Sequence, residues 1–161
     1  MNAPGVRPVV GQSGDVPRRH TRSLGAAVTA LGRAGPFTLT IDRPIDAGGG
    51  GLGFNGGQLL HLAIAACISN DLFREAARLG ITLSRVQVVV DGGFDGDPAV
   101  SSGIRYRVDV EGDRPRAELD DLVELVDRIA EIPNSLRRGT AVTLVASLDE
   151  VADITAEPTA G

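Results

Sequence analysis

One long segment, residues 58–79, constrains the fold of this chain most strongly. Its first half, residues 59–68, is apolar on nearly every side of the predicted helix. A helix of this kind has to be buried on most sides. From Asn70 onward the sequence becomes amphipathic, and Gly80 provides a C-terminal stop. We therefore expect a helix of about six turns whose first half is buried and whose second half emerges toward solvent.

Shorter segments on both sides of this helix alternate in the way that strands do. Before it, residues 22–41 predict a hairpin that turns at residues 32–35. After it, a second antiparallel hairpin, an amphipathic helix that ends at a proline, and a last strand are expected; these elements comprise residues 81–91 and 104–110 with a long turn at 92–102, residues 116–132 before Pro133, and residues 141–148. This order of elements is typical of an α+β fold.

Length and composition place these elements in one globular domain. The chain has 161 residues, of which 42% are hydrophobic and 23% are charged, the balance of a soluble globular protein. Residues 1–20 and 153–161 lack periodicity and are expected to be flexible, which leaves a single domain at residues 21–152. The first residues contain no apolar segment typical of a secretory signal, so a cytoplasmic location is expected.

Composition argues against nucleic-acid, membrane and metal binding. The net charge is -5, and aromatic residues make up only 3% of the chain, which leaves few stacking platforms for nucleic acid. No apolar run approaches the roughly 18 residues of a membrane span. One cysteine, Cys67, and two distant histidines, His20 and His61, do not form a metal-binding pattern. We expect neither a metal nor a cofactor.

The glycine-rich segment 46–57 is a candidate for phosphate binding that the sequence does not support. A phosphate-binding loop requires a terminal Gly-Lys-Ser/Thr, and a dinucleotide fold requires a buried strand before the glycines and a βαβ unit after them. Neither pattern is present. We expect a mobile or tight connector that leads into the long helix.

Cys67 is the residue with the greatest chemical potential, although its local surroundings do not activate it. Free cysteine often fills a protein core, whereas a reactive thiolate needs a nearby cation and some access. Asp71 shares the helix face of Cys67 and is expected to raise the pKa of the thiol, while Arg74 lies about two turns away. His61 is some 120° around the helix, which excludes a Cys-His pair. Activation therefore has to come from elsewhere in the fold or from a second chain.

Two segments resemble the OsmC/Ohr family, named for osmotically inducible protein C and organic hydroperoxide resistance. Residues 54–67, FNGGQLLHLAIAAC, resemble the family's Asn-Pro-Glu-Gln-Leu-Leu…Ala-Ala-Cys segment. Residues 134–139, NSLRRG, resemble its Cys-Pro-x-Ser-Asn-x-Leu-Arg-Arg-Gly stretch. The resemblance covers about residues 20–150. It implies an α+β OsmC-like fold in which antiparallel sheets wrap around two long central helices of an intertwined homodimer.

The resemblance also implies a chemistry for Cys67. Active members of the family reduce hydroperoxides, and Cys67 would be the cysteine that the peroxide oxidises to a sulfenic acid. An arginine of the N-terminal hairpin normally stabilises the thiolate. Arg33 is the best match for that arginine, and Arg22 is the alternative.

Two of the family's functional positions differ in this chain. Gly57 stands where the family has the glutamate that holds the arginine. The second cysteine, which normally resolves the sulfenic acid as a disulfide, is also replaced. Its position is Ala130 in a gapless alignment, or one of the next two residues, Glu131 and Ile132, if a gap is allowed.

Three functions stay open at this point. The protein is a one-cysteine peroxidase in bacterial oxidative-stress defence, recycled by an external low-molecular-weight thiol. Alternatively, it has kept the fold and lost the peroxidase, so that a pocket near Cys67 binds a small apolar or reactive molecule, or the thiol acts as a sensor. In the third, the dimer is a structural or interaction module. The expected partners are a second copy of the chain, a hydroperoxide or other small ligand, and the external thiol.

Overall fold

The computed structural model describes residues 21–24 and 28–145, with side chains described from residue 28 onward. The chain divides between Leu59 and Leu60 into two compact units, and each is described by itself. The ends predicted to be flexible, residues 1–20 and 153–161, lie outside the described residues.

The first unit contains a three-stranded antiparallel sheet in the order β1 (Thr21–Leu24), β2 (Ala30–Ala34) and β3 (Phe37–Ile41). The predicted hairpin is confirmed, but its turn falls at residues 35–36 rather than 32–35. Gly35 has a φ of 58° there, a left-handed conformation that favours glycine. Gly32 instead lies inside β2, where a Cβ atom would come within 2.7 Å of the Ile41 side chain. That glycine makes room for packing and does not form the turn.

Asp42 anchors the glycine-rich segment, which is therefore a tight connector. The segment begins with a short helix, η1 (Ile45–Ala47). The carboxylate of Asp42 accepts backbone N–H groups from Arg43 at 2.7 Å, Gly50 at 3.1 Å and Leu52 at 3.1 Å. These hydrogen bonds, the one from Leu52 above all, hold the pKa of Asp42 below its usual value. The glycines let the backbone pass close enough to β3 to make them.

A reciprocal cap starts the long helix α1 (Gly56–Leu79), which confirms the helix expected at residues 58–79. The Asn55 side chain accepts the backbone N–H of Gln58 at 2.9 Å, and the Gln58 side chain accepts the N–H of Asn55 at 2.9 Å. This arrangement satisfies two backbone donors that would otherwise lack partners. The cap also explains why the family-like segment contains Asn and Gln three residues apart.

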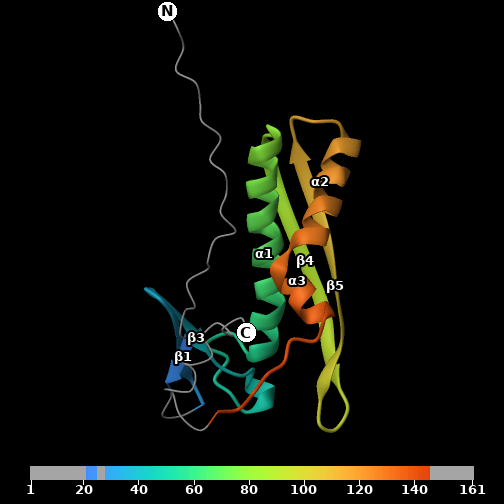
Figure 1. The fold of residues 1–161 in the computed structure, drawn as a ribbon. Helices are drawn as coiled ribbons and strands as arrows, with labels where there is room; N and C mark the ends of the chain where they lie inside the picture. Colours follow the sequence, from blue (N-terminus) through green and yellow to red (C-terminus); the bar gives the residue numbers. More distant parts are fainter. Residues whose placement is uncertain (1–20, 25–27, 146–161) are drawn as a thin grey trace, which may run out of the picture. The chain divides into compact units, whose positions relative to one another are not determined.

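In the second unit, helices cover one face of a long antiparallel hairpin (Figure 1). The hairpin consists of β4 (Leu83–Asp95) and β5 (Val100–Gly112). It is covered by α1 and by α2 (Arg116–Ile129), which is followed by α3 (Glu131–Arg137). The core between them is made of apolar side chains from all of these elements except α3, with Ile68, Leu72, Leu122 and Val126 the most deeply buried.

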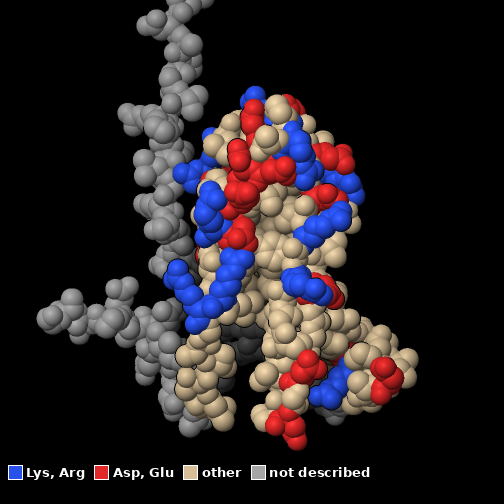
Figure 2. Space-filling model, turned by 90° about the vertical axis from the view of Figure 1, so that its right-hand side faces the viewer, with Lys and Arg blue, Asp and Glu red and all other residues tan. Residues whose placement is uncertain are grey.

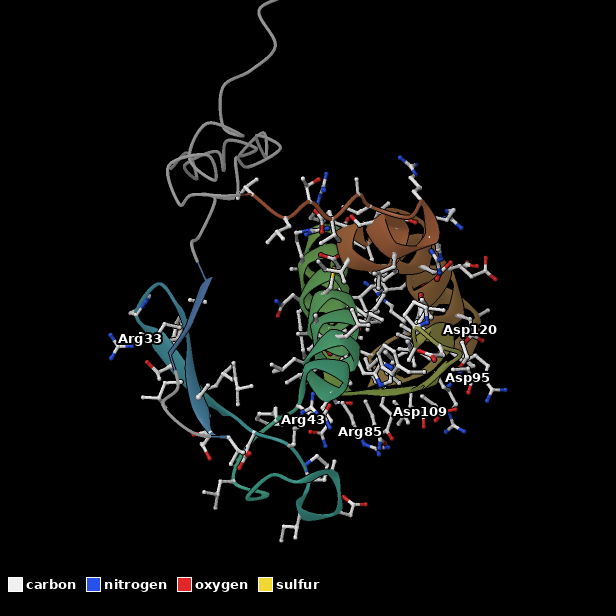
Figure 3. All side chains as sticks on the ribbon, turned by 90° about the horizontal axis from the view of Figure 1, so that it is seen from below. Arg33, Arg43, Arg85, Asp95, Asp109 and Asp120 are labelled. Atoms are coloured by element: carbon white, nitrogen blue, oxygen red, sulfur yellow. The ribbon has the colours of Figure 1, made fainter. Side chains whose placement is uncertain are left out.

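The hairpin alternates between a face that packs on the core and a face open to solvent. Val86, Val88 and Val90 contact the core, whereas the residues between them are exposed. Arg85 and Asp109 project from the outer face in Figure 3. Acidic and basic side chains are interleaved over the upper part of the face that Figure 2 presents.

The second hairpin is confirmed with longer strands and a shorter turn than the sequence predicts. The strands continue to Asp95 and resume at Val100, so most of the segment 92–102 is strand. Gly92 lies within β4 and has to be a glycine, because a Cβ atom there would come within 2.8 Å of the Gly103 carbonyl and 3.0 Å of His61 Nε2. The register of β4 against β5 shifts between Gly92 and Phe94, as it does at a β-bulge.

Pro133 does not end the second helix, and this prediction was wrong. The helix ends earlier, at Ile129, and Ala130 is extended with a φ of -61° and a ψ of 119°. Pro133 lies in the first turn of α3, where its missing N–H costs no helical hydrogen bond. A proline inside a continuous helix would clash with the carbonyl four residues earlier, so the break precedes it. The helix predicted at residues 116–132 is therefore divided between α2 and the start of α3.

The remaining expectations concern the C-terminal strand and the membrane. Residues 141–145 form no regular element, and the rest of the strand predicted at 141–148 lies outside the described residues. None of the helices in the described part of the chain combines the length and the apolar character that a membrane span requires.

Candidate functional site

Cys67 lies on α1 at the point where this helix faces the start of α3. Its side chain is partly buried and packs against the core. The position follows from the apolar first half of α1, because Ile64 and Ile68 on either side of it are buried. The thiol is therefore held at the edge of the core, with limited access to solvent.

Two carboxylates approach the thiol from different helices. Cys67 Sγ lies 3.9 Å from Asp71 Oδ2, one turn further along α1, and 3.8 Å from Glu131 Oε2, at the first residue of α3. Asp71 is buried, with 3% of its surface exposed, whereas Glu131 is exposed. The expected proximity of Asp71 to the thiol is confirmed.

This environment favours the protonated thiol. Burial raises the pKa of Cys67 most strongly, and the charges of Asp71 and Glu131 raise it further. The backbone N–H groups of Ile132 and Glu131 act in the opposite direction without reversing the result. A thiolate at this site needs an additional positive charge.

Arg74 is engaged with buried carboxylates and does not serve the thiol. Its guanidinium lies 2.6 Å from Asp71 and 2.9 Å from Glu75, which are 3% and 7% exposed. Burial still raises the pKa of Asp71, although Arg74 opposes the shift. Arg74 therefore neutralises these two acids.

Arg33, the predicted activating arginine, lies on β2 opposite Thr38 and Arg22 in the sheet register. Its side chain is exposed and projects from the sheet in Figure 3. Arg33 belongs to the first unit and Cys67 to the second. The activating role of Arg33, or of Arg22 in its place, stays a prediction.

Glu131 is one of the three positions, Ala130, Glu131 and Ile132, that the resemblance allows for the resolving cysteine. Ala130, the gapless match, is completely buried, whereas the Glu131 carboxylate lies 3.8 Å from the sulfur. Glu131 is thus one of the alternatives in the sequence analysis, but no sequence pattern indicated an acid beside the thiol. That proximity depends on the break in the helix at Ala130. A continuous helix would not have brought Glu131 to the thiol.

The same three side chains are the candidates for holding a cation. A ligand atom from each of Cys67, Asp71 and Glu131 lies within 4.8 Å of the other two. Asp71 is already paired with Arg74 at 2.6 Å. We therefore assign no metal to this trio.

A hydrogen-bonded network that the sequence did not indicate joins β5, α2 and α3. The Tyr106 hydroxyl donates to Asp127, whose Oδ1 atom lies 2.5 Å from the Arg137 guanidinium. Burial, followed by the bond to Asp127, raises the pKa of Tyr106 to about 12. The hydrogen bonds from Tyr106 and Arg137 lower the pKa of Asp127. Arg137 belongs to the family-like NSLRRG segment, which gives that arginine a structural role here.

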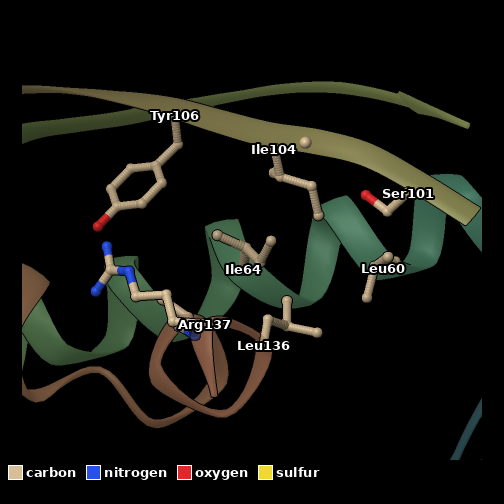
Figure 4. Close-up of a pocket in the computed structure, with 9 residues that line it drawn as sticks. Leu60, Ile64, Ser101, Ile104, Tyr106, Leu136 and Arg137 are labelled. Atoms are coloured by element: carbon tan, nitrogen blue, oxygen red, sulfur yellow. The ribbon is translucent and has the colours of Figure 1, made fainter. Parts of the chain in front are cut away.

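Tyr106 and Arg137 of this network lie at one end of a cavity of about 360 Å³ in the second unit (Figure 4). Side chains of α1, β5 and α3 line it, and they are mostly apolar apart from Ser101, Tyr106 and Arg137. The cavity does not include Cys67 among its lining residues, although Ile64 lies one turn before Cys67 on the same helix.

His61 packs against the second hairpin, away from Cys67. Its Nε2 atom is buried beside Gly92 and has no hydrogen-bond partner among the described residues. The ring is partly exposed, but this nitrogen is not hydrogen-bonded.

Comparison with known proteins identifies the family. The model of the family described as OsmC-like protein matches residues 48–145. No curated protein sequence matches the chain significantly. Among solved structures, an OsmC-like protein from Mycoplasma pneumoniae is 18% identical, with a TM-score of 0.67 over 76% of this chain and 89% of its own.

Two further structures have names that concern hydroperoxides. An organic hydroperoxide resistance protein OsmC from Legionella pneumophila is 18% identical, with a TM-score of 0.60 over 77% of this chain and 92% of its own. A candidate organic hydroperoxide resistance protein from Vibrio cholerae, with captopril bound in one of its active sites, is 18% identical, with a TM-score of 0.58 over 80% of this chain and 90% of its own. These likenesses concern the fold, and the family match covers most of the chain. The chain therefore belongs to the OsmC-like family.

Proposed function

We propose that this protein reduces hydroperoxides with Cys67 as its reactive group and that an external thiol returns Cys67 to its reduced form. The position of Cys67 carries the proposal. The residue is partly exposed where α1 meets α3, within the segment that matches the family. The resistance to organic hydroperoxides for which the Legionella protein is named supports the substrate class.

The proposed cycle uses one cysteine. The Cys67 thiolate attacks a peroxide oxygen, the O–O bond breaks, and the alcohol leaves with a proton, so that Cys67 becomes a sulfenic acid. Glu131, which lies 3.8 Å from the sulfur, cannot form a disulfide. The chain contains no second cysteine. Resolution therefore requires a thiol from outside the chain.

The proposal requires a cation that offsets Asp71 and Glu131. We assign this role to Arg33 of the N-terminal hairpin, with Arg22 as the alternative. Arg33 suits it because its side chain is exposed on a short strand. An Arg33→Ala variant should raise the pKa of the Cys67 thiol, and an unchanged pKa would transfer the role to another residue.

A single-turnover reaction tests the function. Reduced protein receives one equivalent of cumene hydroperoxide or hydrogen peroxide, is trapped with a sulfenic-acid reagent, and is weighed intact. Rapid stoichiometric modification, faster with the organic peroxide, is expected. Cys67→Ser is the control and should consume no peroxide. Modification no faster than that of a free small thiol would refute the proposal.

We also propose that the protein acts as a homodimer in the bacterial cytoplasm, with residues 21–152 as one domain. An apolar stripe on α1 supports the dimer, because Leu62, Ala66, Phe73 and Ala77 recur at helical spacing and are all exposed. Leu62 is 48% and Phe73 is 55% exposed. A reducing compartment suits a free thiol. Sedimentation should give twice the mass of one chain, and Phe73→Glu should halve it.

The cavity of the second unit favours a second candidate, a small-molecule-binding protein without peroxidase activity. The raised pKa of Cys67 is the observation that supports it, because a protonated thiol is a poor nucleophile. In that case cumyl alcohol, the product of cumene hydroperoxide reduction, should shift the methyl NMR signals of Ile64 and Ile104, which line the cavity. Unshifted signals would exclude binding there.

A further inference from the structure

We propose that the cavity between α1, β5 and α3 binds a small uncharged molecule with an apolar body and a hydrogen-bond acceptor, such as a ketone or an alcohol. The inference rests on the second candidate function and deepens it, because it names the class of ligand that the cavity takes. It does not depend on the chemistry of Cys67, which is not among the residues that line the cavity.

The cavity is too large to be a packing defect. Its volume of about 360 Å³ corresponds to on the order of ten water molecules, whereas voids larger than a single water are few in native cores. The volume falls within the range of sites that bind small ligands, roughly 300 to 1,000 Å³. Ser101 and Leu136 on its wall are exposed, which gives a ligand a route into it.

Gly103 on β5 helps to keep this space open. Its φ of 123° favours glycine, and a Cβ atom there would meet nothing within 4 Å among the described residues. A residue with a side chain would be strained at this position. The part of the wall next to Ile104 therefore has no side chain of its own, and the space in front of it is left to a ligand.

The side walls of the cavity suit an apolar ligand body. They are made of apolar side chains from three elements: Leu60 and Ile64 of α1, Ile104 of β5, and Pro133 and Leu136 of α3 (Figure 4). Leu136 is 41% exposed, so part of its apolar surface is in contact with water. A ligand in the cavity would cover this surface, and removing apolar surface from water is favourable.

The polar groups of the cavity gather at its two ends. Tyr106 and Arg137 lie at one end, and Ser101 lies at the other (Figure 4). The Arg137 guanidinium has more N–H donors than its three hydrogen bonds to Asp127 and Asn134 use. Because a guanidinium donates and never accepts, this end of the cavity calls for a hydrogen-bond acceptor on the ligand.

The charge balance at this end favours an acceptor without charge. Arg137 lies 2.5 Å from Asp127 Oδ1, so the two form an ion pair with no net charge. The hydrogen bonds from Tyr106 and Arg137 lower the pKa of Asp127, which keeps its carboxylate ionised. A carboxylate ligand would meet Asp127 beside Arg137, and an ammonium ligand would find Asp127 already neutralised. In a mostly apolar space an unpaired ion costs far more than a hydrogen-bonded carbonyl.

Four molecules of nearly equal size test the ligand class. Benzylacetone is the ketone, and hydrocinnamate, 4-phenylbutan-2-amine and butylbenzene carry a carboxylate, an ammonium and no polar group in its place. Each is titrated into the protein at neutral pH. The NMR signals of the Ile64 methyl groups and of Tyr106, the only tyrosine of the chain, give the dissociation constants. Benzylacetone should bind about tenfold or more tightly than either ion, and about fivefold or more tightly than butylbenzene.

Three variants assign the binding to the cavity. Leu136→Trp fills the cavity from its exposed wall and should weaken benzylacetone about tenfold or more. Leu79→Trp makes the same change at an exposed leucine outside this cavity and should leave the affinity unchanged. Arg137→Lys keeps the charge and loses the planar donor group. It should weaken benzylacetone severalfold and leave butylbenzene unchanged, a difference that a general loosening of the fold would not produce. Melting temperatures show that each variant is folded.

The outcomes separate this inference from the proposed functions. If none of the four molecules binds, the inference and the second candidate function both fail. If butylbenzene or an ion binds as tightly as benzylacetone, the inference alone is overturned and the cavity still binds small molecules. Equal weakening in Leu136→Trp and Leu79→Trp would place the binding elsewhere and overturn it as well. The reaction of Cys67 with peroxide is measured separately by single turnover, so its failure leaves the ligand of the cavity untouched.

Discussion

The carboxylate of Glu131 should suppress the reactivity of Cys67, and Glu131→Gln should release it. The variant keeps the shape of the side chain and removes one negative charge 3.8 Å from the sulfur. Because Glu131 is exposed, the dielectric constant of water is the appropriate screening. At that separation two unit charges interact by about 1 kcal/mol, which corresponds to about a sixfold larger thiolate fraction below the thiol pKa.

Alkylation by iodoacetamide measures this effect, because only the thiolate reacts. The chain has one cysteine, so the intact mass reports Cys67 alone. The rate for Glu131→Gln should exceed that of the wild type about sixfold at pH values below the thiol pKa. The gain should vanish at high pH, where both thiols are ionised. The pH–rate midpoint should accordingly move to lower pH.

The matched control is Glu124→Gln on α2, which changes the net charge equally at an exposed position. Its alkylation rate should equal that of the wild type. A gain below about twofold in Glu131→Gln would refute the assignment, since even full screening by water leaves a larger effect. Equal gains in both variants would show that overall charge, and not contact with the sulfur, sets the rate.

Three further predictions concern stability and titration. Leu72→Ala removes a side chain with 0% exposure and should lower the free energy of unfolding in urea by about 2 to 5 kcal/mol; a loss below about 1 kcal/mol would contradict its place in the core. Tyr106 is the only tyrosine of the chain, so its ultraviolet titration should have a midpoint at about 12, and a midpoint near the ordinary value of about 10 would contradict its bond to Asp127. Burial raises the pKa of Asp71, so the stability it contributes is present below its unfolded-state pKa and is lost as the pH rises through its folded-state pKa. Asp71→Asn should therefore be at least as stable as the wild type at neutral pH, and a large drop in its melting temperature there would show that the pair with Arg74 dominates.

Local patterns predicted most of the elements, because their causes are local. The apolar residues of α1 and the alternation of β4 and β5 follow from which side chains each element buries. The element predictions were wrong where contacts with other parts of the chain determine the local conformation. Gly92 reads as a turn until His61 and Gly103 are placed beside it, and then it is the residue that lets the strand pass. Pro133 predicts the end of a helix, although a proline is equally compatible with the first turn of the next helix.

The neighbours of Cys67 in the candidate site likewise include one that the sequence predicts and one that it does not. Asp71 was predictable from Cys67, because a spacing of four residues places two side chains on one helix face. Glu131 was not predictable as a neighbour, because its position depends on the extended backbone of Ala130, 63 residues further along the chain than Cys67. The Tyr106–Asp127–Arg137 network likewise joins three elements through side chains with no shared sequence pattern.

The loss of the resolving cysteine and the presence of Glu131 beside the thiol have one combined consequence. A second cysteine would trap the sulfenic acid inside the protein, so the external reductant would meet a disulfide. Without it, the reductant of the proposed cycle has to reach Cys67 itself, beside Glu131. Glu131 carries no sulfur and cannot resolve the sulfenic acid. In the proposed cycle it therefore acts on the first step alone: its charge disfavours the thiolate that attacks the peroxide, and Glu131→Gln should speed that step without removing the need for an external thiol.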